Sequence, residues 1–271
     1  AALANYPFAL APGMGLNAYF AYTVVLQMGY SWKVALAAVL VEGIIFILLS
    51  LLSVREAIFD AIPYNLKKAV SVGIGLFIAF IGLQGAHIVV SNESTLLSGV
   101  KFAENWHTEG ICALLALIGL MVTAILYIKK VKASILIGIL VTWILGMLCQ
   151  VTGIYHVDVK AGYYSLYPTL EMTDFSAITK TFGQCFKADF HNVGIFNFIV
   201  VLFSFLFVDM FDTIGTLIGV SDKAGMLDKD GKLPRVKQAL FADAIATSAG
   251  AVLGTSTTTT FVESSAGVGA G

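Results

Sequence analysis

Residues 254–269 read GTSTTTTFVESSAGVG, a run of hydroxyl side chains followed by a glycine-rich end. The consecutive threonines Thr257–Thr260 favour extended chain over helix, because β-branched side chains restrict χ1. We expect a glycine-rich helix to begin near Glu263, where free N–H groups create a polar site and help keep the Glu263 carboxylate ionised. The alternative is an external loop that leads into a plain Ser/Gly-rich helix.

A second irregular stretch lies at residues 7–18, which read PFALAPGMGLNA. Its prolines and glycines interrupt a helix, and Asn17 offers a hydrogen-bond donor and an acceptor beside the break. The sequences PGMG at 12–15 and AGVG at 266–269 are similar G-x-G breaks. Extended backbone at membrane depth is tolerated only where it lines a cavity or is buried in protein. Two such stretches therefore predict paired broken helices that meet around a substrate.

The composition indicates that most of the chain lies in a membrane. Hydrophobic residues make up 58% of the 271 residues and charged residues only 12%, whereas a soluble domain has about 25% charged residues. The apolar excess therefore faces lipid. The net charge of −1 gives no indication of a nucleic-acid partner. The three cysteines form no C-x-x-C pair, which argues against a disulfide framework and against a zinc site.

Apolar runs separated by polar clusters mark the expected membrane spans. They cover residues 7–29, 34–54, 69–91, 110–128, 133–152, 194–220 and 237–254, and an eighth segment begins near Thr255. Residues 153–193 form a long external loop, in which Tyr163, Tyr164 and Tyr167 suit an interfacial position. Asp230-Gly231 predicts a tight turn. The chain begins in an apolar run and ends in a glycine-rich one, so we expect a truncated part of a longer protein.

Lysine and arginine residues predict the orientation of the spans. Eleven of the 16 fall in loops 55–68, 129–132 and 221–237, which lie on one side if the spans alternate. The positive-inside bias places these loops in the cytoplasm. The stretch at 7–29 then runs outward and the stretch after Thr255 runs inward, so the two broken segments are expected to be antiparallel.

Acidic residues inside the spans are the strongest candidates for chemistry, because a charge in the bilayer is costly and usually functional. Asp209 and Asp212 share one face of a helix, and repulsion between their carboxylates favours protonation of one of them. The alternative is that this pair caps the cytoplasmic end of the helix. Asp243, in the next span, is expected either to join the proton path or to pair with a hydroxyl.

Glu42, Gln84 and His87, which lie within other spans, are weaker candidates; we interpret Gln84 as a helix-packing residue and His87 as an interfacial one. The sequence contains no H-E-x-x-H, Walker A or G-x-S-x-G motif, which argues against a membrane enzyme. A channel would show a continuous polar stripe, and an anion transporter would offer cationic or neutral groups. A receptor or scaffold remains an alternative, although it gives no reason for paired broken helices.

Taken together, the motifs resemble those of the hypoxanthine/guanine/adenine permeases, a branch of the nucleobase–cation symporter-2 (xanthine/uracil permease-like) family. The segment APGMGLNAYF at 11–20 resembles their third span, and FVDMFDT at 207–213 resembles their eighth. LGTST at 253–257 with FVES at 261–264 resembles their tenth span, and GIGLFIAFIGLQ at 73–84 looks like their fifth.

This resemblance implies an all-α polytopic membrane fold with inverted seven-span repeats, core and gate domains, and two broken helices with short extended segments. Residues 1–152 would hold spans three to seven, 153–193 an external loop, and 194–271 spans eight to ten. The implied function is proton-coupled uptake of purine bases across the cytoplasmic membrane by alternating access, without a cofactor or metal and with a homodimer as the suggested assembly. The expected site residues are Asn17, Asp209, Thr260, Phe261 and Glu263 for the purine, and Asp212 and Asp243 for the proton.

Overall fold

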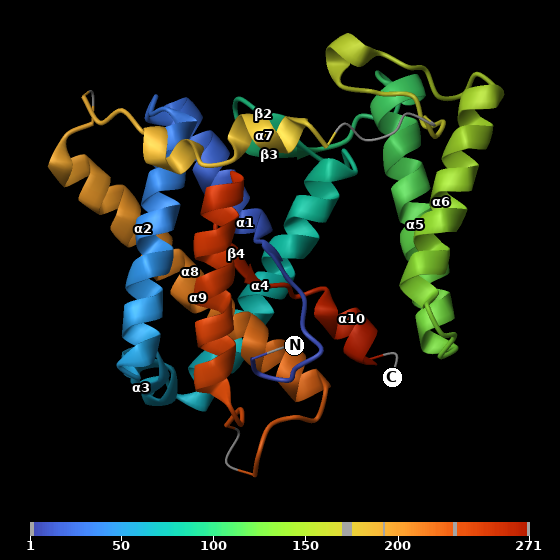
Figure 1. Cartoon of the computed structure of the whole chain (residues 1–271). Helices are drawn as coiled ribbons and strands as arrows, with labels where there is room; N and C mark the ends of the chain where they lie inside the picture. The colour runs from blue at the N-terminus through green and yellow to red at the C-terminus, as the bar shows by residue number, and fades with distance from the viewer. Residues whose placement is uncertain (1–2, 170–174, 192, 230–231, 270–271) are drawn as a thin grey trace. The chain divides into compact units, whose positions relative to one another are not determined.

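The computed structural model describes residues 3–169, 175–191, 193–229 and 232–269. The described chain is mainly helical, and it forms two compact units (Figure 1). Residues 1–74 with 173–269 belong to the first unit, and residues 75–172 belong to the second. The first unit holds both irregular stretches and all of the acidic candidates, so it is the unit that positions the site. The predicted division into 1–152, 153–193 and 194–271 stays a prediction.

In the described part of the chain, five helices are long and apolar enough to cross a membrane. They are α2 (Trp32–Leu51), α4 (Tyr64–Gly85), α5 (Ile111–Ile128), α6 (Ser134–Val151) and α8 (Ile195–Lys223). The apolar runs predicted these five spans, with bounds that differ by a few residues at most ends. The chain is therefore an all-α polytopic membrane protein, as expected.

The two irregular stretches are broken by short strands, as predicted. The first consists of β1 (Leu10–Pro12), α1 (Met14–Ala18) and a π-helical segment, Tyr19–Gln27. The second follows the regular helix α9 (Val236–Leu253), and it consists of β4 (Thr258–Thr260) and α10 (Ser264–Gly269). The predicted helix start near Glu263 is thus correct to within one residue.

The loop predicted at 55–68 is wrong, because these residues are largely helical. Helix α3 (Val54–Ala61) is short and amphipathic, and its residues Arg55 and Phe59, one turn apart, are both buried. Helix α4 begins directly after Pro63, whose carbonyl accepts the first helical hydrogen bonds. A charged segment between two apolar runs looks like a loop in sequence, although here its helix α3 packs Phe59 into the hydrophobic core of the first unit.

Helix α4 ends earlier than predicted, at Gly85, and His87 follows with a positive φ of 56°. A β-hairpin of β2 (Val89–Asn92) and β3 (Leu96–Gly99) occupies the end of the predicted span. Gln84 is exposed, and a side chain added at the neighbouring glycines would meet no atom of the described chain within 4 Å. The predicted helix packing at Gln84 is therefore absent within the described residues.

Small residues allow α5 and α6 to pack closely in the second unit. Gly119 of α5 faces Thr142 of α6, and Gly138 of α6 faces Thr123 of α5, so that a Cβ at either glycine would collide with the opposite threonine. Each threonine hydroxyl donates to the carbonyl of the glycine four residues earlier on its own helix, at 2.8 Å. Both helices thus carry a Gly-x-x-x-Thr spacing, a small-residue pattern typical of membrane helix pairs.

The predicted external loop contains short structured segments, and it belongs partly to each unit. In the second unit, Tyr163 is buried against Ile111 and Leu115, whereas Tyr164 and Tyr167 are exposed; the interfacial position of the three tyrosines stays a prediction. In the first unit, α7 (Ala177–Thr181) and a 3-10 turn at Gln184–Lys187 precede α8. The predicted Asp230-Gly231 turn lies outside the described residues.

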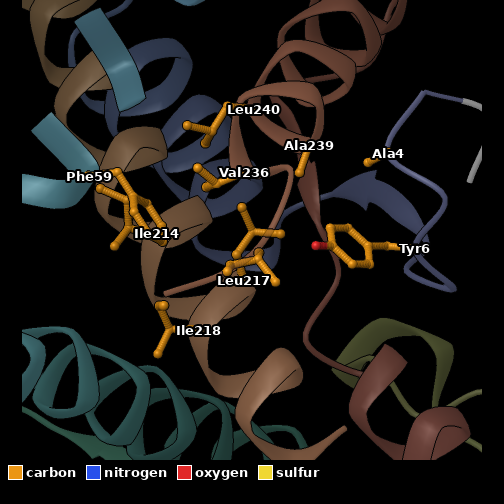
Figure 2. Close-up of a cluster of buried hydrophobic side chains, with 10 residues drawn as sticks. Ala4, Tyr6, Phe59, Ile214, Leu217, Ile218, Val236, Ala239 and Leu240 are labelled. Atoms are coloured by element: carbon orange, nitrogen blue, oxygen red, sulfur yellow. The ribbon is translucent and has the colours of Figure 1, made fainter. Parts of the chain in front are cut away.

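A hydrophobic cluster packs α3, α8 and α9 together in the first unit (Figure 2). Phe59, Ile214, Leu217 and Leu240 lie at its centre, each no more than 2% exposed. Between membrane helices such side chains act through van der Waals packing, because lipid is as apolar as they are. The cluster therefore fixes the relative positions of the helices that carry Arg55, Asp209 and Asp243.

Candidate functional site

The two broken segments meet in an antiparallel pair of strands. Leu10 pairs with Thr260 and Pro12 with Thr258, so β1 and β4 run in opposite directions. Beyond the strands, the Gly13 N–H donates to the Thr257 carbonyl at 3.3 Å. This pairing confirms the predicted antiparallel meeting of the two breaks, which come from residues about 250 positions apart.

Gly13 is required at this meeting point for steric reasons. A Cβ at Gly13 would lie 2.8 Å from the Thr259 methyl group and 3.4 Å from an Asp212 carboxylate oxygen. The backbone of the first segment can therefore approach the second only because residue 13 has no side chain. The close approach also brings Asp212, which is half-buried, to the edge of the strand pair.

Hydroxyl groups of the threonine run are buried and bonded within the first unit. The Thr247 hydroxyl of α9 donates to the Thr258 carbonyl at 2.6 Å, and the Ser256 hydroxyl donates to the Asn17 side-chain oxygen. Thr260 is buried as well, at 3% exposed, whereas the Asn17 residue remains exposed overall. The hydroxyl side chains thus hold the second broken segment against α9 and against α1.

Three fully buried carboxyl groups, each 0% exposed, lie on the helices behind the strands: Glu42 on α2, Asp209 on α8 and Asp243 on α9. The guanidinium of Arg55, itself 2% exposed, lies among them. Its Nη2 is 3.3 Å from Asp243 Oδ2 and 3.9 Å from Asp209 Oδ2, and its Nη1 donates to the Leu240 carbonyl at 3.0 Å. Arg55 therefore pairs with two aspartates at once.

The Thr213 hydroxyl joins these acids to the strand pair. Its oxygen lies 3.1 Å from Asp209 Oδ1, 3.2 Å from Asp243 Oδ2 and 2.9 Å from the Thr259 hydroxyl. A hydroxyl has one proton to donate, and an ionised carboxylate only accepts. If both aspartates are ionised, the Thr213 hydroxyl can donate to only one of them, and the other contact has no proton. Both contacts become hydrogen bonds when one aspartate is protonated.

The predicted purine-binding residues divide between an open cavity and the buried network. Glu263, which is exposed, and Phe261, which is half-buried, line a cavity of about 630 Å³ together with Pro7, Ala9, Met226 and Gly267. Asp209 does not line this cavity, because it is enclosed beside Arg55 and Thr213. The structure therefore brings Phe261 and Glu263 together at this cavity, whereas Asp209 belongs to the buried network.

The free N–H groups predicted at the start of the second helix are mostly occupied. The N–H groups of Ser264, Ser265 and Ala266 donate to the carbonyls three residues earlier, at 2.9–3.0 Å. These are hydrogen bonds between residues three apart, which use N–H groups that the first turn of a helix otherwise leaves free. The predicted polar helix start is therefore wrong for these three groups, and the accessible polar group here is the Glu263 carboxylate.

Sequence reasoning underestimated two members of the buried network. Arg55 was assigned to a cytoplasmic loop, and Glu42 was ranked below the aspartates, yet each lies in contact with residues far away in the chain. The Glu42 carboxylate accepts the Thr257 hydroxyl at 2.8 Å, across 215 residues. The signal that could have found Glu42 is the rule that an acid in an apolar span needs a partner.

A comparison with protein families matches the entire chain: residues 1–271 fit the model of the Permease family. The chain belongs to the Permease family. This permease is accordingly a multi-pass protein of the cell membrane, with the spanning helices described above.

Several curated proteins are similar to the permease along 99% of its length. A putative permease of Methanocaldococcus jannaschii is 47% identical over 268 residues, and the match covers 56% of that protein. The guanine/hypoxanthine permease PbuG of Bacillus subtilis is 45% identical over 271 residues, with 56% of it covered. The adenine permease AdeP of Escherichia coli is 39% identical over 268 residues, with 55% of it covered. The chain thus spans about half the length of the curated relatives it matches.

Proposed function

We propose that the full-length protein takes up purine bases, namely hypoxanthine, guanine and adenine, across the cell membrane by proton symport with alternating access. The proposal rests on the meeting of the two broken segments beside an open cavity that Phe261 and Glu263 line. Relatives at 39–45% identity carry the names guanine/hypoxanthine permease and adenine permease, which support this class of substrate.

The groups at the cavity suit a neutral purine. The Glu263 carboxylate can accept ring N–H groups, and a charged acceptor makes a stronger hydrogen bond than a neutral one. Phe261 offers an aromatic face for stacking on the base. Asn17 and Thr260, on the two broken segments, add polar groups beside the strand pair. Asp209 is connected to this strand pair by the Thr213 hydroxyl, which contacts both Asp209 and Thr259, so we propose that its charge acts on the purine site.

Proton coupling is proposed to involve Asp212 and Asp243, two of the acids that lie inside the spans. Asp212 lies at the edge of the strand pair, and Asp243 shares the Thr213 hydroxyl with Asp209. Uptake of a proton reduces the net negative charge of the site, so the loaded site can move through the low-dielectric part of the membrane.

Other readings have less support. Relatives are named permeases, and the sequence has no H-E-x-x-H, Walker A or G-x-S-x-G motif, so we infer that the protein is not an enzyme. The acidic site argues against a small anion as cargo, and a non-transporting scaffold would not need a buried charge network. A transporter of the same architecture for another nucleobase is the alternative, and a homodimer is the proposed assembly.

The test is uptake of radiolabelled hypoxanthine by purine-transport-deficient cells that express the full-length protein. We expect saturable uptake that guanine and adenine compete away and that a protonophore abolishes. Cells that express an Asp212→Asn variant are the control, because uptake that persists in them does not depend on the proposed proton site. Absence of purine uptake by cells with the protein at their membrane would contradict the proposed substrate, and uptake insensitive to the protonophore would contradict proton symport.

A further inference from the structure

Glu42 is a buried carboxyl group with little to stabilise its ionised form. It lies in the middle of α2 and is 0% exposed. Its Oε2 accepts the Thr257 hydroxyl at 2.8 Å, while its Oε1 has no hydrogen-bond partner in the described ranges. A carboxylate removed from water and held by a single hydrogen bond is strongly disfavoured, whereas a carboxylic acid there carries no charge.

The charged groups that face Glu42 do not neutralise it. They are Arg55 of α3 and Asp243 of α9, and Asp209 of α8 lies in the same charge network. The Arg55 guanidinium is already directed at Asp243 and Asp209, and the described residues contain no ion pair between Arg55 and Glu42. Three buried carboxyls thus share one guanidinium, and Glu42 is the one without a cation in contact.

Glu42 is joined directly to the point where the broken segments meet. Thr257, which donates to Glu42 through its hydroxyl, also accepts the Gly13 N–H through its carbonyl. The preceding residue, Ser256, binds Asn17 of α1. A change in the charge of Glu42 therefore acts on a residue that holds both broken segments, next to the strand pair.

We propose that Glu42 is the residue that carries the transported proton, and that Thr257 transmits its charge state to the broken segments. On the outward-facing side the carboxylate takes up one proton and becomes a neutral carboxylic acid; on the inward-facing side it returns that proton to the cytoplasm. The Thr257 hydroxyl donates to Oε2 in both states, and the proton is carried on Oε1. This inference rests on the proposed proton symport; it makes Glu42 the carrier, and Asp212 and Asp243 keep their proposed part in coupling.

The test compares the full-length parent with its Glu42→Gln variant in liposomes. A glutamine has the shape of the protonated acid but cannot release a proton. We expect the variant to exchange hypoxanthine between equal pools at a rate within about twofold of the parent, a difference of about 0.4 kcal/mol. We expect it to lose accumulation driven by an inside-alkaline gradient, which for a one-to-one symporter reaches about tenfold per pH unit in the parent.

Further variants separate proton carriage from a structural role. Thr257→Val keeps the Glu42 carboxyl and removes its hydrogen bond to residue 257, so this variant is also expected to lose accumulation. Ser50→Ala changes another buried polar residue of α2, and Glu104→Gln changes a carboxyl that is 64% exposed; both are expected to accumulate like the parent. Accumulation by Glu42→Gln at the parent's level, or loss of its exchange activity, would overturn the assignment. Failure of the parent itself to accumulate hypoxanthine would instead refute proton symport, and with it the role of Glu42.

Discussion

Replacing Arg55 by methionine is expected to lower the free energy of unfolding by about 3–5 kcal/mol, the cost of removing one partner from a buried ion pair. Arg55 is 2% exposed and is the cation between Asp209 and Asp243, so its loss leaves two buried aspartates without a counter-charge. Equilibrium unfolding of the full-length protein in mixed detergent micelles measures the difference. The deficit should shrink at acidic pH, because protonation of the orphaned carboxyls removes the charge that Arg55 neutralised.

Two controls accompany the Arg55 variant. Lys232, which is 59% exposed and 3.7 Å from Asp60, forms a surface pair, and its replacement by methionine should cost less than about 1 kcal/mol. The double variant Arg55→Met/Asp243→Asn should recover part of the lost stability, because it removes both charges of the shorter pair. An Arg55→Met variant as stable as the parent would show that the buried guanidinium does not stabilise this network.

A Glu263→Gln substitution is expected to weaken hypoxanthine binding by roughly 10- to 100-fold, since a hydrogen bond to a charged group contributes about 1.5–3 kcal/mol. Glu263 is exposed at the cavity, so the variant should keep the parent's stability. Binding of radiolabelled hypoxanthine to the purified protein measures the effect. Glu263→Asp, which keeps the charge on a shorter side chain, should lose less affinity. Equal affinity in the parent and in Glu263→Gln would exclude this carboxylate from the binding site.

The sequence predicted the helices and the breaks well because both leave local signals. Long apolar runs mark α2, α5, α6 and α8, and no tertiary contact is needed to recognise them. The threonine run and the G-x-G breaks predicted β4 and its meeting with the first segment, since β-branched residues and glycine have strong backbone preferences. The hairpin after α4 was missed, because its apolar first strand continues the hydrophobic run of the preceding helix.

The buried network could be predicted only in part, because its contacts join distant residues. Asp209 and Asp243 were found from their placement in spans, but nothing local to Arg55 shows that it lies beside them, 154 and 188 residues away. A basic residue between two apolar runs matches the positive-inside pattern equally well. That Asp209 does not line the cavity of Glu263 likewise depends on which face of α8 is buried in the packed unit, and helical spacing alone does not specify that face.

The most direct test of the central claim is whether a purine protects the cavity beside the broken segments. Gly267 lines this cavity and a side chain there has open space. Gly267→Cys therefore places a single reactive thiol in it, once Cys112, Cys149, Cys185 and any cysteine in the rest of the full-length protein are replaced by serine. Gly99→Cys, in the hairpin of the second unit, is the matched control with equally open space. Saturating hypoxanthine is predicted to slow alkylation at position 267 and to leave position 99 unchanged. Unchanged alkylation at position 267, in a protein that still transports hypoxanthine, would contradict a purine site in this cavity.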